Sequence, residues 1–370
     1  MSQPIRVVVV DDSALARSII TDLLERDSAI QVVGSAGDGR AAIALVQELR
    51  PDIVTMDVRM PVMDGLATTE YLMAYCPTPI LVLTASLASH DVDITFKMLG
   101  AGALEVLEKP GGSPADLARA GRALSRRIKV LARVKVVTHL RGRRKPPSAT
   151  LPPAAAPKLA TLPSEPAPPT SLETPAFPLI VIGASTGGPR AVSQVLAGLP
   201  RGLGAAVLVV QHIAAGFSAG LAEWLAHTSP LPVRLPHEGY ALRPGEVLVA
   251  PDQADLLIAA DGTVHLSANP LLLQRPSIDI SMQAAAAMFG PRALGVLLTG
   301  MGRDGAYGLL AIKRAGGHTI AQDETTSTIF GMPRAAIHLG AACEVLPATE
   351  IGARLAALVH AMQPAERGAR

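Results

Sequence analysis

The feature that most constrains this chain is a proline-rich stretch that divides it near the middle. From Arg141 to Pro178 the sequence reads RGRRKPPSATLPPAAAPKLATLPSEPAPPTSLETPAFP, and its prolines and small residues give it neither a helical repeat nor a packable apolar face. The chain has 370 residues, which exceeds the usual size of one domain. We therefore predict a first domain over residues 4–125, a linker over 126–177 and a second domain over 178–363.

The composition of the chain excludes several classes of protein. Hydrophobic residues make up 49% and charged residues 17%, and the formal net charge is +2. These values fit a soluble globular protein that binds no nucleic acid. Aromatic residues make up only 3%, so stacking platforms for bases are not expected. A basic group lies in the linker and is interpreted as a solvated margin in preference to a docking patch; it consists of Arg141, Arg143, Arg144 and Lys145.

The cysteines and the N-terminal residues indicate a cytoplasmic protein. Cys76 and Cys343 are the only cysteines and do not have a metal-binding spacing, so neither a disulfide framework nor a zinc site is expected. The apolar run Val7–Val10 is broken at once by Asp11 and Asp12, unlike the long apolar region of a signal peptide. No apolar stretch approaches the ~18 residues of a membrane span. We expect no direct membrane insertion.

Short apolar runs alternate with helix-like segments in the first domain. The expected strands are Ile5–Val10, Ile53–Met56, Ile80–Leu83 and Ala103–Leu107. The expected helices are Ala14–Arg26, Ala41–Glu48, Gly65–Cys76, Val92–Leu99 and Pro114–Arg126. This alternation predicts an α/β fold, a doubly wound parallel sheet with helices on both faces, in which ligands collect at the carboxyl ends of the strands.

The same alternation resumes after the linker. The expected strands are Leu179–Ile182, Ala206–Val210 and Ala293–Leu298, and the expected helices are Ala191–Leu196, Ser218–His227, Ile278–Phe289 and Ile351–Met362. Between them, Leu256–Ala260 and Thr263–Ser267 flank Asp261-Gly262, a pair typical of a two-residue hairpin turn. The second domain is therefore predicted to be α/β, with a mostly parallel sheet and an antiparallel hairpin.

Charged and hydroxyl side chains follow the predicted strands of the first domain. Asp11 and Asp12 end one strand, Asp57 ends another, and Thr84 and Lys109 follow two more. Carboxylates gathered at one edge repel each other, and a hard divalent cation with oxygen ligands relieves that repulsion. A hydroxyl and an ammonium at the same edge can bind the oxygens of a phosphoryl group on Asp57. Each residue alone is explained by a helix cap or a solvated face, but those explanations do not account for four successive strand ends.

The runs VVVVDDSALAR, TMDVRMPVMDGL, LVLTAS and LEKP resemble the receiver domain of two-component response regulators, over roughly residues 4–125. The resemblance implies a five-stranded, flavodoxin-like parallel sheet. It implies that Asp57 accepts phosphate from a histidine kinase and that Asp11, Asp12 and Asp57 hold Mg²⁺. It also implies that Thr84 and Lys109 respond to the phosphoryl group.

A glycine-rich turn follows the first predicted strand of the second domain. The residues Gly183-Ala184-Ser185-Thr186-Gly187 fit G-x-S-x-G, which places a serine on a sharp turn between a strand and a helix. Gly187 and Gly188 permit a tight turn and leave amide N–H groups at the start of a helix, where an anion is stabilised. A phosphate-binding P-loop is the alternative, but this turn lacks the lysine that a P-loop needs.

A nucleophilic serine needs a base, and the base needs an orienting carboxylate. Among nine histidines, His212 stands out because it closes the apolar strand AAVLVVQ and so lies at the same sheet edge as Ser185. The run GVLLTGMGRDGA supplies Asp304 after another buried strand. The competing carboxylates are Asp252, Asp255, Asp279 and Asp323. The order Ser, His, Asp differs from that of the α/β-hydrolases, so a different fold is expected.

These loops, together with RPSIDISM at Arg275–Met282, resemble the catalytic domain of the chemotaxis protein-glutamate methylesterases, the CheB family, over about residues 178–363. The resemblance implies hydrolysis of glutamate γ-methyl esters on chemoreceptors, which releases methanol, and deamidation of receptor glutamines, with no cofactor for the esterase chemistry. It implies that Ser185 is the nucleophile, His212 the general base and then acid, and Asp304 the orienting carboxylate.

The resemblance also implies supporting groups and partners. Thr186 and the backbone N–H of Met301 are similar to groups that position His212 and bind the oxyanion. In the family, the receiver blocks the active site until its aspartate is phosphorylated. The implied partners are methyl-accepting chemoreceptors as substrate and the chemotaxis histidine kinase as phosphodonor, and the chain is expected to be a monomer. Two positions depart from the family pattern: Val106 stands where an aromatic switch residue is common, and Ile-Ala-Ala-Gly-Phe follows His212 where prolines are common.

Two other classes of function remain as alternatives. One alternative is a signalling module whose second domain binds a partner without catalysis, but a degenerate enzyme usually loses at least one of Ser185, His212 and Asp304. A response regulator that acts on DNA would need a basic helix-turn-helix region after the linker, and none is present in the sequence.

Overall fold

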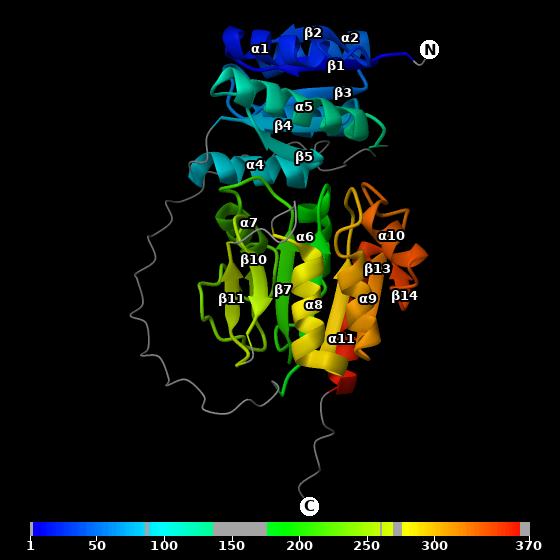
Figure 1. Cartoon of the computed structure of the whole chain (residues 1–370). Helices are drawn as coiled ribbons and strands as arrows, with labels where there is room; N and C mark the ends of the chain where they lie inside the picture. The colour runs from blue at the N-terminus through cyan, green and yellow to red at the C-terminus, as the bar shows by residue number, and fades with distance from the viewer. Residues whose placement is uncertain are drawn as a thin grey trace, which may run out of the picture.

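The computed structural model in Figure 1 consists of two α/β domains, one stacked on the other. It describes residues 3–85, 89–134, 136, 176–259, 261–268 and 276–362. The basic group of the linker, most of the linker itself and Arg275 lie outside the described residues. Within the described part of the chain, no helix combines the length and the apolar character that crossing a bilayer requires.

Five strands form the sheet of the N-terminal domain, in the order β2-β1-β3-β4-β5, and all neighbours are parallel. Their bounds are β1 Ile5–Val10, β2 Ile30–Ala36, β3 Ile53–Asp57, β4 Ile80–Thr84 and β5 Glu105–Glu108. This confirms the predicted doubly wound, five-stranded sheet. The apolar runs did not reveal β2, because this edge strand interrupts its apolar residues with Gln31, Gly34 and Ser35 and is buried at its two ends only.

Helices cover both faces of this sheet. Their bounds are α1 Ala14–Glu25, α2 Gly39–Leu49, α3 Gly65–Tyr75, α4 Ser89–Ala101 and α5 Pro114–Leu131. Helix α5 begins with a capping box between Ser113 and Asp116 and with Pro114 in its first turn. It continues past its predicted end at Arg126, because Ile128 and Leu131 extend the apolar stripe that is buried against the sheet.

Seven parallel strands form the main sheet of the C-terminal domain, in the order β14-β13-β12-β6-β7-β9-β8. Their bounds are β6 Leu179–Ala184, β7 Ala206–Gln211, β8 Val233–Arg234, β9 Val247–Val249, β12 Ala293–Leu297, β13 His318–Gln322 and β14 Glu344–Leu346. The central strands β6, β7 and β12 are buried throughout, as continuous apolar runs in a parallel sheet should be.

The predicted hairpin forms a separate two-stranded antiparallel sheet from β10 Asp255–Ile258 and β11 Val264–Ser267. The helices of this domain are α6 Gly188–Ala197, α7 Ser218–Ala226, α8 Ile278–Phe289, α9 Ala306–Arg314, α10 Met332–His338 and α11 Ala348–Met362. Alternate residues of β6 face two different apolar clusters, one shared with α6, α7 and α11 and the other with α8, α9 and α10. The sheet is therefore covered on both faces, and its strand ends are left to form a site.

The N-terminal domain lies against one end of the C-terminal domain, with α4 above α7 (Figure 1). The buried Phe96 ring of α4 stacks on Trp224 of α7, with centroids 5.9 Å apart, and meets Phe217 edge-on at 6.5 Å. One apolar cluster passes through this contact and includes core residues of both sheets, among them Val54 and Ile182. The two domains thus share part of a hydrophobic core.

Candidate active site

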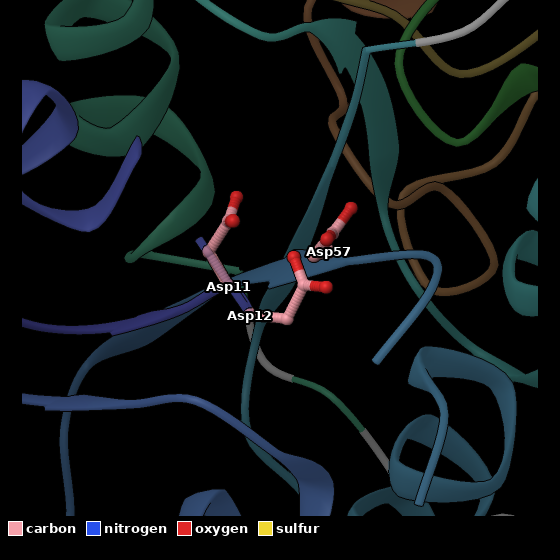
Figure 2. Close-up of side chains that lie close together, drawn as sticks. All are labelled: Asp11, Asp12 and Asp57. Atoms are coloured by element: carbon pink, nitrogen blue, oxygen red, sulfur yellow. The ribbon is translucent and has the colours of Figure 1, made fainter. Parts of the chain in front are cut away.

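Three aspartates meet at the carboxyl ends of β1 and β3 in the N-terminal domain. Figure 2 shows Asp11 and Asp12, which follow β1, beside Asp57, the last residue of β3. Ligand oxygens of the three side chains all lie within 4.8 Å of one another. Asp11 and Asp57 are buried and Asp12 is exposed. An all-oxygen, carboxylate donor set of this kind suits a hard divalent cation such as Mg²⁺.

The Lys109 ammonium lies among these carboxylates. Its Nζ is 2.7 Å from Asp11 Oδ2 and 2.9 Å from Asp57 Oδ2. Burial alone would lower the pKa of Lys109, but hydrogen bonds and charge from the two aspartates outweigh burial and raise that pKa. Burial raises the pKa of Asp57, against the lowering effect of Lys109. The lysine therefore remains charged and partly neutralises the cluster.

The remaining receiver site residue predicted from the sequence, Thr84, lies at the same edge of the sheet as this cluster. Thr84 is the buried last residue of β4, and its carbonyl accepts a hydrogen bond of 2.8 Å from the Lys109 N–H. Val106, at the position where an aromatic switch residue is common in the family, is buried in β5 and pairs with Val82. The structure thus gathers Asp11, Asp57, Thr84 and Lys109 at one edge of the sheet.

The glycine-rich turn of the second domain connects β6 to α6. The Ser185 N–H donates to the Thr299 carbonyl at 3.0 Å, and the Gly188 N–H donates back to the Ser185 carbonyl at 2.7 Å. Gly187 has φ +75°, and a Cβ at this position would lie 2.3 Å from Thr328 Oγ1. Both the left-handed backbone and the close neighbour require glycine here. The turn is held rigidly enough to fix the serine backbone.

A second glycine brings another loop directly against the serine. A Cβ at Gly300 would lie 2.7 Å from Ser185 Cβ and 2.2 Å from Met332 Sδ. The backbone after β12 therefore passes close to Ser185, and the loop that follows Gly300 carries both Met301 and Asp304. The strand ends of β6 and β12 converge as the sequence predicted.

His212 and Asp304 form a hydrogen-bonded pair beside this turn. His212 Nε2 lies 2.8 Å from Asp304 Oδ2, and the His212 N–H donates to the carbonyl of Ala184, the residue before Ser185, at 3.0 Å. His212 Nδ1 is buried and has no hydrogen-bond partner among the described residues. With Nε2–H directed at the carboxylate, Nδ1 is the nitrogen left to accept a proton.

The Asp304 carboxylate is held by the N-terminus of α8. It accepts hydrogen bonds from Ser277 Oγ at 3.2 Å and from the backbone N–H groups of Ile278 at 2.8 Å and Asp279 at 3.0 Å. Burial would raise the pKa of Asp304, but the hydrogen bond and charge of His212 together with these N–H groups outweigh burial and lower that pKa. Asp304 is therefore ionised at neutral pH.

The competing carboxylates do not pair with His212. Asp252 accepts from the Ser218 N–H at 2.9 Å, Asp255 from the Ser277 N–H at 2.7 Å, and Asp279 from the Gly308 N–H at 2.6 Å. Asp323 accepts from Thr325, Thr326 and the Thr326 N–H. Each thus fixes a loop or a helix start, and within the described residues only Asp304 pairs with His212.

Sequence reasoning missed two residues that hold the site. The buried Gln211 donates through Nε2 to the Ser185 carbonyl at 2.9 Å and to the His212 carbonyl at 2.8 Å, so one side chain ties together the two loops. Ser277 supports Asp304, as described above, and caps α8. A polar residue at the end of the apolar run AAVLVVQ was the available sign of Gln211. Ser277 stands before the apolar start of α8, where an N-cap is expected.

The N-terminal domain covers the site through β5 and α5. The Thr186 hydroxyl donates to Glu105 Oε2 at 2.8 Å, and Arg127 Nε lies 3.2 Å from Glu105 Oε1. Burial raises the pKa of Glu105, although Arg127 and Thr186 act to lower it. In this arrangement the Thr186 side chain is therefore engaged by the N-terminal domain.

A cavity of about 290 Å³ remains between the two domains. Glu105, Val106 and Arg127 line it from one side, and Ser185 and His212 line it from the other. Ser185 is only 5% exposed. A large substrate therefore reaches the serine only if the domains separate.

Fold and site together define a response-regulator receiver joined to an esterase-type α/β domain. Sequence models of two families match: CheB methylesterase over residues 180–355 and Response regulator receiver domain over residues 7–120. The chain belongs to the CheB methylesterase family that carries an N-terminal receiver domain.

Relatives share this two-domain organisation over nearly their whole length. A protein-glutamate methylesterase/protein-glutamine glutaminase of Anaeromyxobacter dehalogenans is 47% identical over 94% of this chain and 95% of its own. One of Myxococcus xanthus is 42% identical over 94% of this chain and 92% of its own. The crystal structure of the Thermotoga maritima CheB methylesterase catalytic domain is 38% identical, covers 49% of this chain and 98% of its own, and aligns with a TM-score of 0.48.

Proposed function

We propose that this chain is a phosphorylation-activated enzyme that hydrolyses glutamate methyl esters on chemoreceptors, releases methanol, and deamidates receptor glutamines. The observation that carries the proposal is the 2.8 Å hydrogen bond between His212 and Asp304 next to the Ser185 turn. The names of the full-length relatives, protein-glutamate methylesterase/protein-glutamine glutaminase, support both activities. Hydrolysis of the ester returns a glutamate carboxylate to the receptor and so resets its sensitivity.

In the proposed first step, Ser185 Oγ attacks the ester carbonyl carbon while His212 Nδ1 takes the hydroxyl proton. The Asp304 carboxylate stabilises the imidazolium through Nε2–H. The tetrahedral intermediate then expels methoxide, which receives the proton from His212 and leaves as methanol. The products of this half-reaction are methanol and an acyl ester on Ser185.

In the second step, water attacks the acyl ester with His212 again as base, and Ser185 leaves with the returned proton. The backbone N–H of Met301 and Thr186 are proposed to stabilise the oxyanion, an effect whose loss typically costs ~10²–10³ in rate. Deamidation follows the same path with ammonia as leaving group. Because Thr186 bonds to Glu105 in the covered arrangement, its proposed role requires the receiver to move away.

Methanol release from methylated receptor membranes tests this activity directly. The wild-type chain, treated with a small phosphodonor, is expected to release methanol, and a Ser185→Ala chain is expected to release none above background. Equal release from both proteins would overturn the assignment of Ser185 as nucleophile.

For the receiver half, we propose that Asp57 accepts the phosphoryl group of a chemotaxis histidine kinase. Asp11, Asp12 and Asp57 are proposed to hold Mg²⁺, which would neutralise the negative charge of the phosphoryl group during transfer. Lys109 and Thr84 are proposed to bind the phosphoryl oxygens. Breaking the contact between Lys109 and the Asp57 carboxylate then changes the end of β5, whose first residue, Glu105, bonds to Thr186.

A phosphodonor experiment tests this regulation. Treatment of the wild-type chain with acetyl phosphate and Mg²⁺ is expected to raise its esterase rate, and an Asp57→Ala chain is expected to keep its basal rate. If both chains had the same rate after treatment, control through Asp57 would be wrong.

We further propose that the chain works as a cytoplasmic monomer with a receiver over residues 4–125, a linker over 126–177 and a catalytic domain over 178–363. Two observations support these assignments. The two free cysteines, Cys76 and Cys343, suit a reducing compartment. The family matches over residues 7–120 and 180–355 fall within the two proposed domains.

A further inference from the structure

A groove of about 630 Å³ opens beside the loop that carries Asp304, on the surface of the C-terminal domain. It lies between the loop after β12, helix α9 and helix α10. The side chains that matter for its chemistry are Met301, Arg303, Tyr307, Arg334, His338 and Leu339. The activity proposed above involves none of these side chains.

The groove gathers exposed apolar side chains. Met301 is 40% exposed, Tyr307 57% and Leu339 37%. They are three of the eight large hydrophobic residues that are exposed in the described part of the chain, and they lie together instead of being scattered. A cluster of this kind on a polar surface marks a site of interaction with another macromolecule.

The groove is also basic. Arg303, Arg334 and His338 are all exposed and line it, and none of the described residues that line it carries a carboxylate. No ion pair within the described residues joins Arg303 or Arg334 to an acidic group. The groove therefore fits a partner segment that has both apolar and acidic side chains.

The position of the groove relates it to the reaction. Its backbone wall includes Gly331, whose N–H donates to the Gly300 carbonyl at 3.2 Å, and Gly300 lies against Ser185. A polypeptide bound in the groove would thus extend from the side of the site where Met301 and Asp304 lie. The described residues that line the groove all belong to the C-terminal domain, so the receiver does not cover it.

We propose that this groove docks the segment of the substrate protein that flanks the reacting side chain. This proposal rests on the function proposed above. Both reactions leave a glutamate carboxylate on the substrate, so a segment with several modifiable residues becomes acidic and matches the two arginines. The apolar side chains of the same segment would cover Met301, Tyr307 and Leu339. The groove supplies binding energy away from the reacting atoms and thereby selects the protein substrate.

Steady-state methanol release from methylated receptor membranes tests the proposal, with the full chain activated by a small phosphodonor. Arg334→Glu is expected to raise KM about tenfold while kcat stays unchanged, as for lost binding that is equal in ground and transition states. The matched control is Arg201→Glu, an exposed arginine elsewhere on the same domain, which should leave KM unchanged. Tyr307→Ala, a change at an exposed residue, should also raise KM. Added salt should raise the KM of the wild-type chain more than that of Arg334→Glu.

Two results would overturn the docking proposal. One is a KM for Arg334→Glu and Tyr307→Ala equal to that of Arg201→Glu, and the other is a loss that lies entirely in kcat. A wild-type chain that released no methanol from any receptor membrane would instead overturn the proposed function, and docking with it. The wild-type measurement in the same assay separates these failures.

Discussion

Asp304 shows how strongly a single residue depends on its surroundings here. Its carboxylate accepts hydrogen bonds from His212, from the Ser277 hydroxyl and from the N–H groups of Ile278, Asp279 and Gly305. All these groups are donors, so they favour the ionised acceptor and fix its orientation. The carboxylate in turn requires His212 to carry its proton on Nε2, which leaves Nδ1 able to accept a proton, as the proposed mechanism needs.

Asp304→Asn should therefore reduce kcat for ester hydrolysis by about 10⁴. The asparagine oxygen can still accept the hydrogen bonds from the backbone N–H groups of α8. The NH₂ group of the asparagine then faces His212 Nε2. That nitrogen must then accept, so the imidazole proton moves to Nδ1 and blocks proton removal from the serine. Methanol release per activated enzyme measures the effect.

Asp279→Asn provides the matched control, because the neighbouring Asp279 bonds to Gly308 and not to His212. The Asp279 change should cost much less activity than the Asp304 change. Similar losses from both changes would contradict the orientation of His212 by Asp304.

At the residue scale, sequence reasoning located the residues that follow apolar strands. Ser185 and His212 stand directly after such runs and Asp304 lies in the glycine-rich loop that follows another, and the parallel sheet brings these loops to one edge. Gln211 and Ser277 could not be assigned in this way, because their importance depends on which carbonyl or carboxylate they reach. Hydrogen-bond partners of that kind are set by three-dimensional packing and leave no spacing in the chain.

Among the secondary-structure elements, β5 connects the two halves of the molecule. Glu105, its first residue, bonds to Thr186 of the catalytic domain, and Lys109, just after its end, contacts Asp57. Arg127 of α5 holds Glu105 in place from the next element. The contact between Lys109 and Asp57 and the contact between Glu105 and Thr186 therefore lie at opposite ends of one short strand.

Arg127→Ala should raise the basal esterase rate of the unphosphorylated chain. It leaves the Glu105 carboxylate buried between the domains without its cation, which weakens docking of the receiver. Arg127 is partly exposed, so we expect its loss to weaken the free energy of domain docking by about 1 kcal/mol. If the open form is rare, this change raises the basal rate roughly fivefold. Methanol release without phosphodonor measures it.

The neighbouring Arg126 gives a matched control, because it lies on the exposed face of the same helix. Arg126→Ala should leave the basal rate unchanged. If both arginine variants had the basal rate of the wild-type chain, the ion pair would not contribute to covering the site.

At the element scale, the long apolar central strands and the edge strand β5 were predicted, whereas five shorter or more polar strands were not. The runs of β1, β3, β4, β6, β7 and β12 are nearly continuous in apolar residues. The strands β2, β8, β9, β13 and β14 lie at or next to sheet edges and were not among those predicted; β9 is a buried apolar run of only three residues. The other four contain more polar residues, such as His318 and Thr319 in β13, so their apolar pattern is weaker.

For the whole molecule, docking of the two domains should depend on pH through Glu105. Burial at the interface raises the pKa of this carboxyl, so the docked form binds more protons than the open form. Docking is therefore favoured as the pH falls toward that raised pKa and is weakened as the pH rises through it. The docked fraction of the unphosphorylated chain should increase as the pH is lowered from neutral toward the raised pKa of Glu105.

Small-angle scattering of the unphosphorylated chain can measure this change as a decrease in radius of gyration at lower pH. In the Glu105→Gln chain the side chain at this position cannot ionise, so the radius of gyration of that chain should depend less on pH. The same pH dependence in both chains would show that another group controls docking.

At this scale the sequence indicated two domains and the general regulation, but not the contact between them. The residues that form the interface, such as Phe96, Trp224 and Glu105, are far apart in the chain and belong to no motif used in the assignment. The helices that face each other are determined by the shape complementarity of the two folded domain surfaces. Local patterns in a single sequence do not report that complementarity.

The apolar cluster that passes from Phe96 into the C-terminal domain has a thermal consequence. Separating the domains exposes hydrophobic side chains to water, and hydration of such surface increases heat capacity. The free energy of domain release must then curve with temperature, with hydrophobic docking weakening on cooling. Basal activity, corrected for the temperature dependence of the chemical step, would therefore depend on the temperature of the cell as well as on the activity of its kinase.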